Sequence, residues 1–190
     1  MKYIKILGLM AVAAAALMAF AGTAAATVLE GKEGNLPKGT KIDSTGTNAV
    51  LKAGFATIEC AHSEVDGTTS NAGGAGETVE GNISNLTFKE CNATVNVIKK
   101  GKLIVHYSSG SNGTVTSEGA EVTVETGGIS CTYGTPTATS IGTLSGGSPA
   151  KLNASAALTR VAGSFLCANP ASWTATYTVT SPNPLYVTAS

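Results

Sequence analysis

The sequence predicts an all-β fold, an antiparallel β-sandwich or a barrel-like arrangement, preceded by an export signal. Short runs that alternate apolar and polar residues recur along the chain, and glycine or asparagine separates them. Leucine and lysine, which favour helices, are sparse beyond the first 26 residues. Four cysteines in a chain with an export signal indicate disulfides.

The alternating runs give the expected strands in order. They cover residues 48–60, 77–88, 93–109, 108–128 and 171–180. Within the third run, Lys100-Gly101 is expected to turn a hairpin, and Asn112-Gly113 and Glu118-Gly119 are expected to turn further hairpins. Residues 135–147 are rich in glycine, serine and threonine and are expected to form a loop.

The last run places its residues on two faces. Trp173, Ala175 and Val179 share one strand face with Tyr177, and four threonines occupy the other face. Because alanine and valine have no reason to face water, we expect Trp173 to lie in the core rather than on a binding surface. The threonines are expected on a half-exposed outer face, where β-branched hydroxyl side chains are favoured.

The N-terminal residues 1–26 have the pattern of a cleaved signal peptide. Lys2 and Lys5 precede an apolar run, and Ala24-Ala25-Ala26 satisfies the small-residue rule for cleavage before Thr27. The apolar run is short of the about 20 residues that a spanning helix needs, so a membrane anchor is the weaker reading. We expect residues 27–190 to form one secreted or cell-envelope domain without a stable membrane span.

The four cysteines, Cys60, Cys91, Cys131 and Cys167, are expected to form two disulfides. None of them is spaced as in C-x-x-C, which argues against a zinc site. A weak internal echo, "ATIEC" with "LTFKEC" and "GGISC" with "GSFLC", suggests two lobes, 39–108 and 112–190, which are either related repeats or have converged on a similar β-strand composition. Loop entropy does not choose between the connectivities, so locality favours Cys60 with Cys91 and Cys131 with Cys167.

Charge argues against a nucleic-acid partner. Without Lys2 and Lys5 the chain has ten basic and twelve acidic residues, and Arg160 is its single arginine. Phosphate recognition usually needs arginine clusters and a basic patch.

The residues that could carry hydrolytic chemistry are few. The chain has two histidines, His62 and His106, and Asp66 could in principle join His62 and a serine. Glu121 and Glu125 share a strand face, but a glycosidase needs two carboxylates opposed across a cleft, and no calcium-loop motif accompanies them. We expect no catalytic residue, metal or cofactor.

Several motifs carry a resemblance that covers residues 39–190. "LTFKEC", "GGISCTYGT", "IGTLSGG" and "GSFLCANPASWTATYTVTSPNPLYV" resemble small secreted, β-rich, four-cysteine proteins of actinobacteria that have no assigned activity. "IEC" with "GNISNLTF" is also similar to exported activators of alkane oxidation. The resemblance implies an exported, disulfide-containing all-β fold and transfers no functional residue.

The expected function is therefore that of an exported, non-catalytic structural or binding protein. Its expected partner is cell-wall or extracellular polysaccharide, or another envelope protein. A carbohydrate-binding or adhesive module is the first alternative, which exposed Tyr133, Tyr177 or Tyr186 on one flat face would favour. A secreted hydrolase is the second, and it would require His62 or His106 in a cleft beside a carboxylate and a serine.

Cleavage of the signal is directly testable. N-terminal sequencing of the exported protein is expected to begin at Thr27, within a few residues, because the small-residue site ends at Ala26. Retention of Met1 together with tight membrane association would contradict this prediction.

Overall fold

The computed structural model describes residues 26–54 and 56–190, and every regular element within these ranges is a β-strand. The expected signal peptide falls almost wholly outside them. No helix in the described part of the chain is long and apolar enough to cross a membrane. The strands are β1 (Thr27–Gly31), β2 (Gly34–Asn35), β3 (Lys41–Ala53), β4 (Ala56–Thr69), β5 (Val79–Cys91), β6 (Thr94–Lys99), β7 (Lys102–Ser109), β8 (Asn112–Glu118), β9 (Glu121–Thr126), β10 (Ile129–Gly134), β11 (Thr139–Ser145), β12 (Lys151–Gly163), β13 (Ala171–Ser181) and β14 (Tyr186–Ala189).

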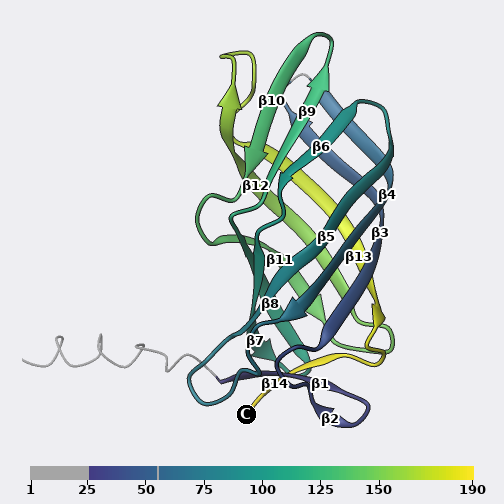
Figure 1. The fold of residues 1–190 in the computed structure, drawn as a ribbon, viewed down its shortest axis with the longest axis vertical. Coiled ribbons are helices and arrows are strands. Elements are labelled where there is room, and N and C mark those ends of the chain that lie inside the picture. The colour runs from purple at the N-terminus through teal and green to yellow at the C-terminus, as the bar shows by residue number, and fades with distance from the viewer. Residues whose placement is uncertain (1–25, 55) are drawn as a thin grey trace, which may run out of the picture.

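Of the two arrangements that the sequence allowed, the structure has the barrel. Eight antiparallel strands follow one another around it in the order β3-β4-β5-β7-β8-β11-β12-β13, and β13 pairs with β3 to close the ring (Figure 1). Thr47 of β3 lies opposite Thr176 of β13 at this closure. This one ring contains strands from both expected lobes, and a relationship between the two lobes stays a prediction.

Three shorter strands extend the wall at one end of the barrel. β6 pairs with β9, β9 pairs with β10, and β10 pairs with the last part of β12. Along the chain, β6 is followed directly by β7, β8 by β9, and β10 by β11. In each case the two consecutive strands together extend along the barrel wall (Figure 1). We call the end with the β9–β10 hairpin the upper end.

The expected turns at 100–101 and 118–119 are wrong. β6 and β7 do not pair with each other, and neither do β8 and β9. Instead, both segments are kinks at which a strand changes partners, and Gly101 and Gly119 adopt positive φ there. A Cβ at Gly101 would overlap the backbone at Glu118 and Ala120, so glycine is what lets the two kinks lie side by side.

Two further expectations are also corrected. The turn between β7 and β8 lies at Gly110-Ser111, and Asn112-Gly113 already belongs to β8. The expected loop 135–147 contains β11, which pairs with β8 on one side and β12 on the other. Among its threonines, serines and glycine, β11 carries two buried apolar residues, Ile141 and Leu144, which pack in the core.

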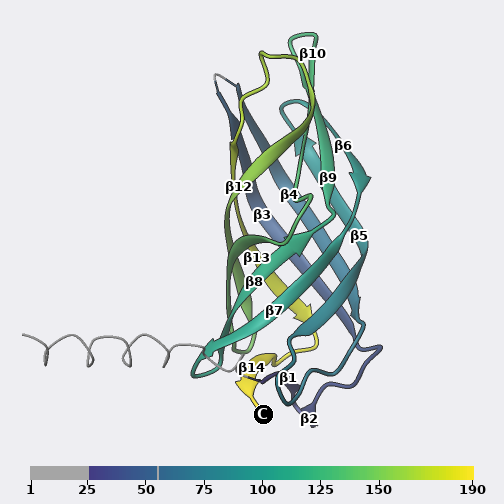
Figure 2. The ribbon, with the colours of Figure 1, turned by 90° about the vertical axis from the view of Figure 1, so that its left-hand side faces the viewer.

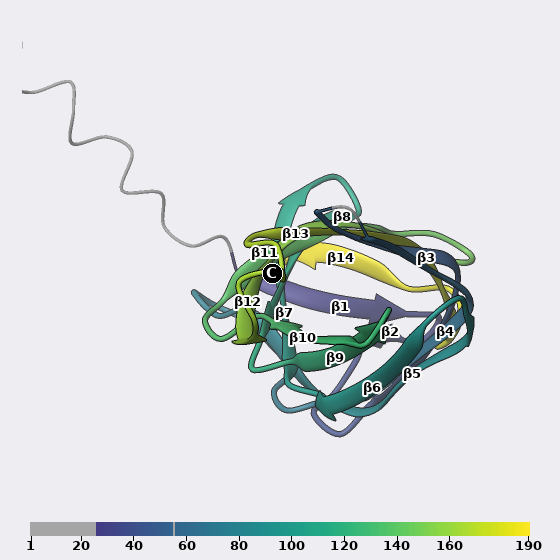
Figure 3. The same ribbon diagram turned by 90° about the horizontal axis from the view of Figure 1, so that it is seen from above.

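The lower end of the barrel is covered by a separate small sheet. β1 pairs with β14 and β2, and together they cross the end of the ring (Figure 3). Leu29 of β1 and Val187 of β14 are almost fully buried against barrel residues such as Val115. The first and last strands of the domain therefore seal its lower end.

Both expected disulfides are formed, Cys60–Cys91 and Cys131–Cys167. The first joins paired residues of β4 and β5, and the second joins β10 to the loop between β12 and β13. All four cysteines of the chain are used. Disulfides of this kind are typical of proteins that fold in an oxidising, extracellular environment.

Peptide mapping can test this connectivity. Trypsin should release each cysteine in its own peptide, and mass spectrometry without reduction should find 53–89 joined to 90–99, and 103–151 joined to 161–190. Closing loops of this length stabilises the fold by roughly 3–4 kcal/mol per bridge in the chain-entropy model. Any other linked pair would refute the connectivity.

A candidate binding cavity inside the barrel

The barrel encloses two adjoining apolar cavities. The upper cavity has a volume of about 110 Å³ and the lower one about 100 Å³. Both are bordered by the same waist of residues, so they lie end to end along the barrel. The waist consists of Val65, Ile83, Leu103, Leu152 and Tyr177.

Small side chains on the inner face explain why space remains. Ala49 of β3, Ala154 and Ala156 of β12 and Ala175 of β13 all point inward and are buried. Of these four, Ala49 lines the upper cavity, and it fills much less of the interior than the leucine or isoleucine found elsewhere in that lining. Natural cores are usually packed to crystal-like density, so interior space of this size is a specific feature of the fold.

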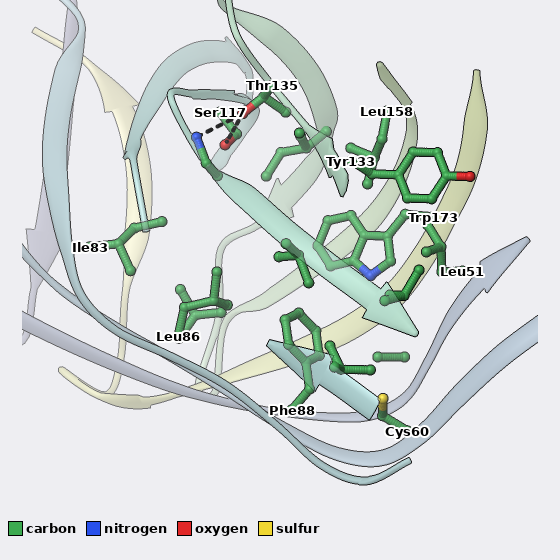
Figure 4. Close-up of a pocket in the computed structure, with 18 of the residues that line it drawn as sticks. Leu51, Cys60, Ile83, Leu86, Phe88, Ser117, Tyr133, Thr135, Leu158 and Trp173 are labelled. Carbon is green, nitrogen blue, oxygen red and sulfur yellow. Dashed lines mark hydrogen bonds between the residues drawn. The ribbon is translucent and has the colours of Figure 1, made fainter. Parts of the chain in front are cut away.

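The lining of the upper cavity has no charged side chain. Its residues are aliphatic or aromatic, apart from Cys60, Ser117, Gly134 and Thr135. The hydroxyls of Ser117 and Thr135 lie 3.0 Å apart and hydrogen-bond each other at one side of the cavity (Figure 4). A charged ligand group would therefore be buried there without a counter-ion, which is costly.

Trp173 faces the interior as predicted, but it borders open space instead of being packed on all sides. It is partly buried, lines the upper cavity and lies among its apolar side chains (Figure 4). Its ring centroid is 6.1 Å from that of Tyr177, with the planes tilted by 49°. No hydrogen bond to the indole N–H is found among the described residues, so this donor can serve an occupant of the cavity.

Tyr177 anchors the waist between the cavities. Its hydroxyl lies 2.8 Å from that of Ser63 on β4, and both groups are buried. A Cβ at Gly46 would come within 2.7 Å of the Tyr177 ring, so the glycine makes room for the ring to lie flat against β3. Burial raises the pKa of Tyr177 to about 12, an effect that the hydrogen bond with Ser63 partly offsets.

A second interior tyrosine has no such partner. Tyr133 of β10 is 1% exposed, and within the described part of the chain its buried hydroxyl has no hydrogen-bond partner. Burial raises its pKa, and the positive charge of Arg160 acts in the opposite direction. Such an unsatisfied hydroxyl is unusual in a native interior.

The residues that sequence reasoning considered for hydrolysis lie outside the cavity lining. His62 is exposed on β4 with its Nε2 3.6 Å from a carboxylate oxygen of Glu90, and Asp66 accepts a hydrogen bond from Asn85. His106 of β7 lies opposite Thr114 of β8. The structure does not bring the two histidines together.

The two glutamates that the sequence analysis considered, Glu121 and Glu125, both lie on β9. Glu121 forms an ion pair with Lys99, and Glu125 is exposed on the same strand. The described residues contain no group of three His, Cys, Asp or Glu side chains that could hold a metal ion.

The aromatic surface that would favour carbohydrate binding is not formed by the three tyrosines considered. Tyr133 and Tyr177 are buried inside the barrel, and Tyr186 is half-buried on β14. The threonines of β13 do lie on the outer surface, where Thr176 stands between Thr47 of β3 and Asn153 of β12.

Comparisons with models of protein families, with curated proteins and with solved structures found no match for this chain. The resemblance to secreted actinobacterial proteins therefore stays a prediction, and the argument for function depends on the cavity alone.

Sequence reasoning missed the cavity. It recognised the inward face of β13 but assumed that this face would be fully packed. The available signal was a small residue at an inward position, Ala49, between larger apolar residues of the run 48–60. Only the closure of the sheet brings that position near the lining residues of the other strands.

The buried Tyr177 hydroxyl predicts a specific pH dependence. An unfolded tyrosine titrates near pH 10, whereas the folded protein holds this proton to about pH 12. The folded state therefore binds more protons in this window, and its stability must fall as the pH rises through it. Chemical denaturation at pH 9 to 12 should show that Tyr177→Phe removes on the order of 2 kcal/mol of this decline.

Ser63→Ala is the matched variant, because it keeps the tyrosine buried and should retain the steep decline. Equal pH slopes for the wild type and Tyr177→Phe would contradict the assignment.

Proposed function

We propose that this protein is an exported, non-catalytic binding protein that holds a small, uncharged, apolar molecule inside its barrel. The observation that carries the proposal is the pair of adjoining apolar cavities. An engineered cavity of about 150 Å³ lined by similar side chains is known to take up benzene. The two cavities together offer more space than that, in an elongated shape.

The chemistry of the lining supports an uncharged ligand. Apolar contact with Leu51, Ile58, Leu86 and Leu158 would provide most of the binding free energy. The Trp173 indole N–H offers one hydrogen bond to an acceptor on the ligand. In the upper cavity a carboxylate or sulfonate would lose its hydration without meeting a cation, and in the lower cavity it would meet the carboxylate of Glu80 in the lining.

Export is part of the proposal, and the two disulfides support it. They hold the wall at the upper end, where β4 meets β5 and where β10 meets the β12–β13 loop. A binding protein with these bridges keeps its cavity under oxidising conditions outside the cell.

A pair of matched dyes tests the proposal. N-phenyl-1-naphthylamine is uncharged, and 1-anilinonaphthalene-8-sulfonate has the same ring system with a sulfonate. The uncharged dye is expected to bind, gain fluorescence and accept excitation energy from Trp173, the single tryptophan. The sulfonate should bind at least about tenfold more weakly, which corresponds to about 1.4 kcal/mol.

Filling the cavity should remove this binding. Ala49→Leu adds a larger side chain to the upper lining, and we expect it to weaken binding of the uncharged dye by about tenfold. Thr47→Leu on the exposed outer side of the same strand is the control and should bind as the wild type does. Absence of energy transfer, or equal binding of both dyes, would overturn the proposal.

A further inference from the structure

The barrel wall has one seam that backbone hydrogen bonds do not close. β5 pairs with β7 only from Val79 to Asn82, and β6 pairs with β9. Among the described residues, no backbone hydrogen bond joins 84–91 of β5 to β6. The two strands lie on the same side of the molecule and are joined at the top by the short turn 92–93 (Figure 2).

The seam is bounded at both ends. At its lower end the Ile83 N–H donates to the carbonyl of Gly101, 3.1 Å away. There the Lys100 ammonium also donates to the Ser84 carbonyl at 2.6 Å, so this side chain crosses from the β6–β7 kink to β5. Above these contacts the strand edges are held only by side chains and by the turn.

Apolar side chains that line the upper cavity flank this seam. Leu86 and Phe88 of β5 and Val95 of β6 border the upper cavity, yet each is only partly buried. On the neighbouring strands β3 and β4, Ala49 and Ile58 border the same cavity and are 3% exposed, whereas Val65 of β4 is partly buried. What distinguishes the β5–β6 side is that partly buried lining residues flank a gap in the backbone hydrogen bonds.

The two ends of the barrel are better covered than the seam. Leu29 of β1 and Leu185, which directly precedes β14, are 1–2% exposed and line the lower cavity. At the upper end, Val124 and Tyr133 pack near the Cys131–Cys167 bridge around a space of only about 20 Å³.

We propose that the seam between β5 and β6 is the entrance through which the ligand reaches the cavity. This inference rests on the proposed function, and it adds that the ligand is a flat or chain-like apolar molecule that passes edgewise between two strands. Leu86, Phe88 and Val95 line the passage, and Lys100 holds its lower end together.

Cross-linking the seam tests the entrance. Lys89→Cys and Asn96→Cys place thiols on exposed positions of β5 and β6, and a short bismaleimide then joins them. The lost contact of Lys89 with Glu64 is a surface ion pair and should matter little. Thr45→Cys with Thr178→Cys is the matched control, because this pair spans the hydrogen-bonded seam between β3 and β13.

The expected result is kinetic. Stopped-flow mixing with N-phenyl-1-naphthylamine should show that the cross-linked seam slows association and dissociation alike, by about tenfold or more, with the dissociation constant little changed. The same double variant capped with N-ethylmaleimide, and the cross-linked β3–β13 control, should exchange the dye at the wild-type rate. Lys100→Ala should speed both processes, whereas Lys52→Ala on β3 should not.

The outcomes separate the two proposals. If the wild type binds the dye but the cross-link leaves both rates unchanged, the entrance is refuted and the binding function stands. If the cross-link weakens equilibrium binding without slowing exchange, it has damaged the cavity and the entrance is likewise refuted. If the wild type does not bind the dye at all, the proposed function fails and the entrance fails with it. Far-ultraviolet circular dichroism of every cross-linked sample shows whether the barrel is retained.

Discussion

Pairing of β13 with β3 is the constraint on which the rest of the structure depends. It joins strands that begin about 130 residues apart in the chain and turns a meander into a ring. Closure satisfies the outer edges of both strands and defines an inside. Once the ring exists, each residue of a long strand faces either the interior or the solvent. Consequently Trp173 and Tyr177 share the interior with Ala49, although they are distant in sequence.

The interior is shaped by a balance between alanine and aromatic side chains. Tyr177 and Trp173 both line the upper cavity, and the small side chain of Ala49 on β3 leaves part of the space beside them unfilled. By the measured cost of cavities, about 110 Å³ of empty space lowers stability by roughly 2–3 kcal/mol. The two disulfides offset a loss of this size. The fold can therefore keep open space that an ordinary core would fill.

The disulfides and kinks also determine which neighbouring strands of the wall are held together and which two, β5 and β6, can separate. Cys60–Cys91 ties β4 to β5 just before the turn into β6, so β5 stays attached to the β4 side. The kink at Lys100-Gly101 then directs β6 toward β9 and away from β5. Separation of the two strands is thus a consequence of where β6 finds its hydrogen-bonding partner. A ligand could cross the wall there without breaking a backbone ladder.

Local pattern by itself determined the strand content, the two faces of 171–180 and the inward position of Trp173. Strand alternation is a property of neighbouring residues, so it can be read without knowing the partners. The disulfide pairs were predicted correctly from locality. Local pattern could not determine which strands pair. It therefore took the Lys100-Gly101 kink for a turn. It took β11 for a loop because glycine, serine and threonine dominate that segment and a bulge between Ser140 and Gly142 interrupts its alternation.

Tertiary structure alone decided the barrel, the cavity and the seam. The cavity exists because a closed ring brings together lining residues from distant strands, such as Ala49 of β3, Leu86 of β5 and Leu158 of β12, and no single strand contains that information. The seam exists because β6 pairs with β9 and leaves β5, a choice made by strands far apart in the chain. Features that depend on one strand are determined by the sequence of that strand. Features made of empty space or of missing hydrogen bonds depend on how all the strands close around them.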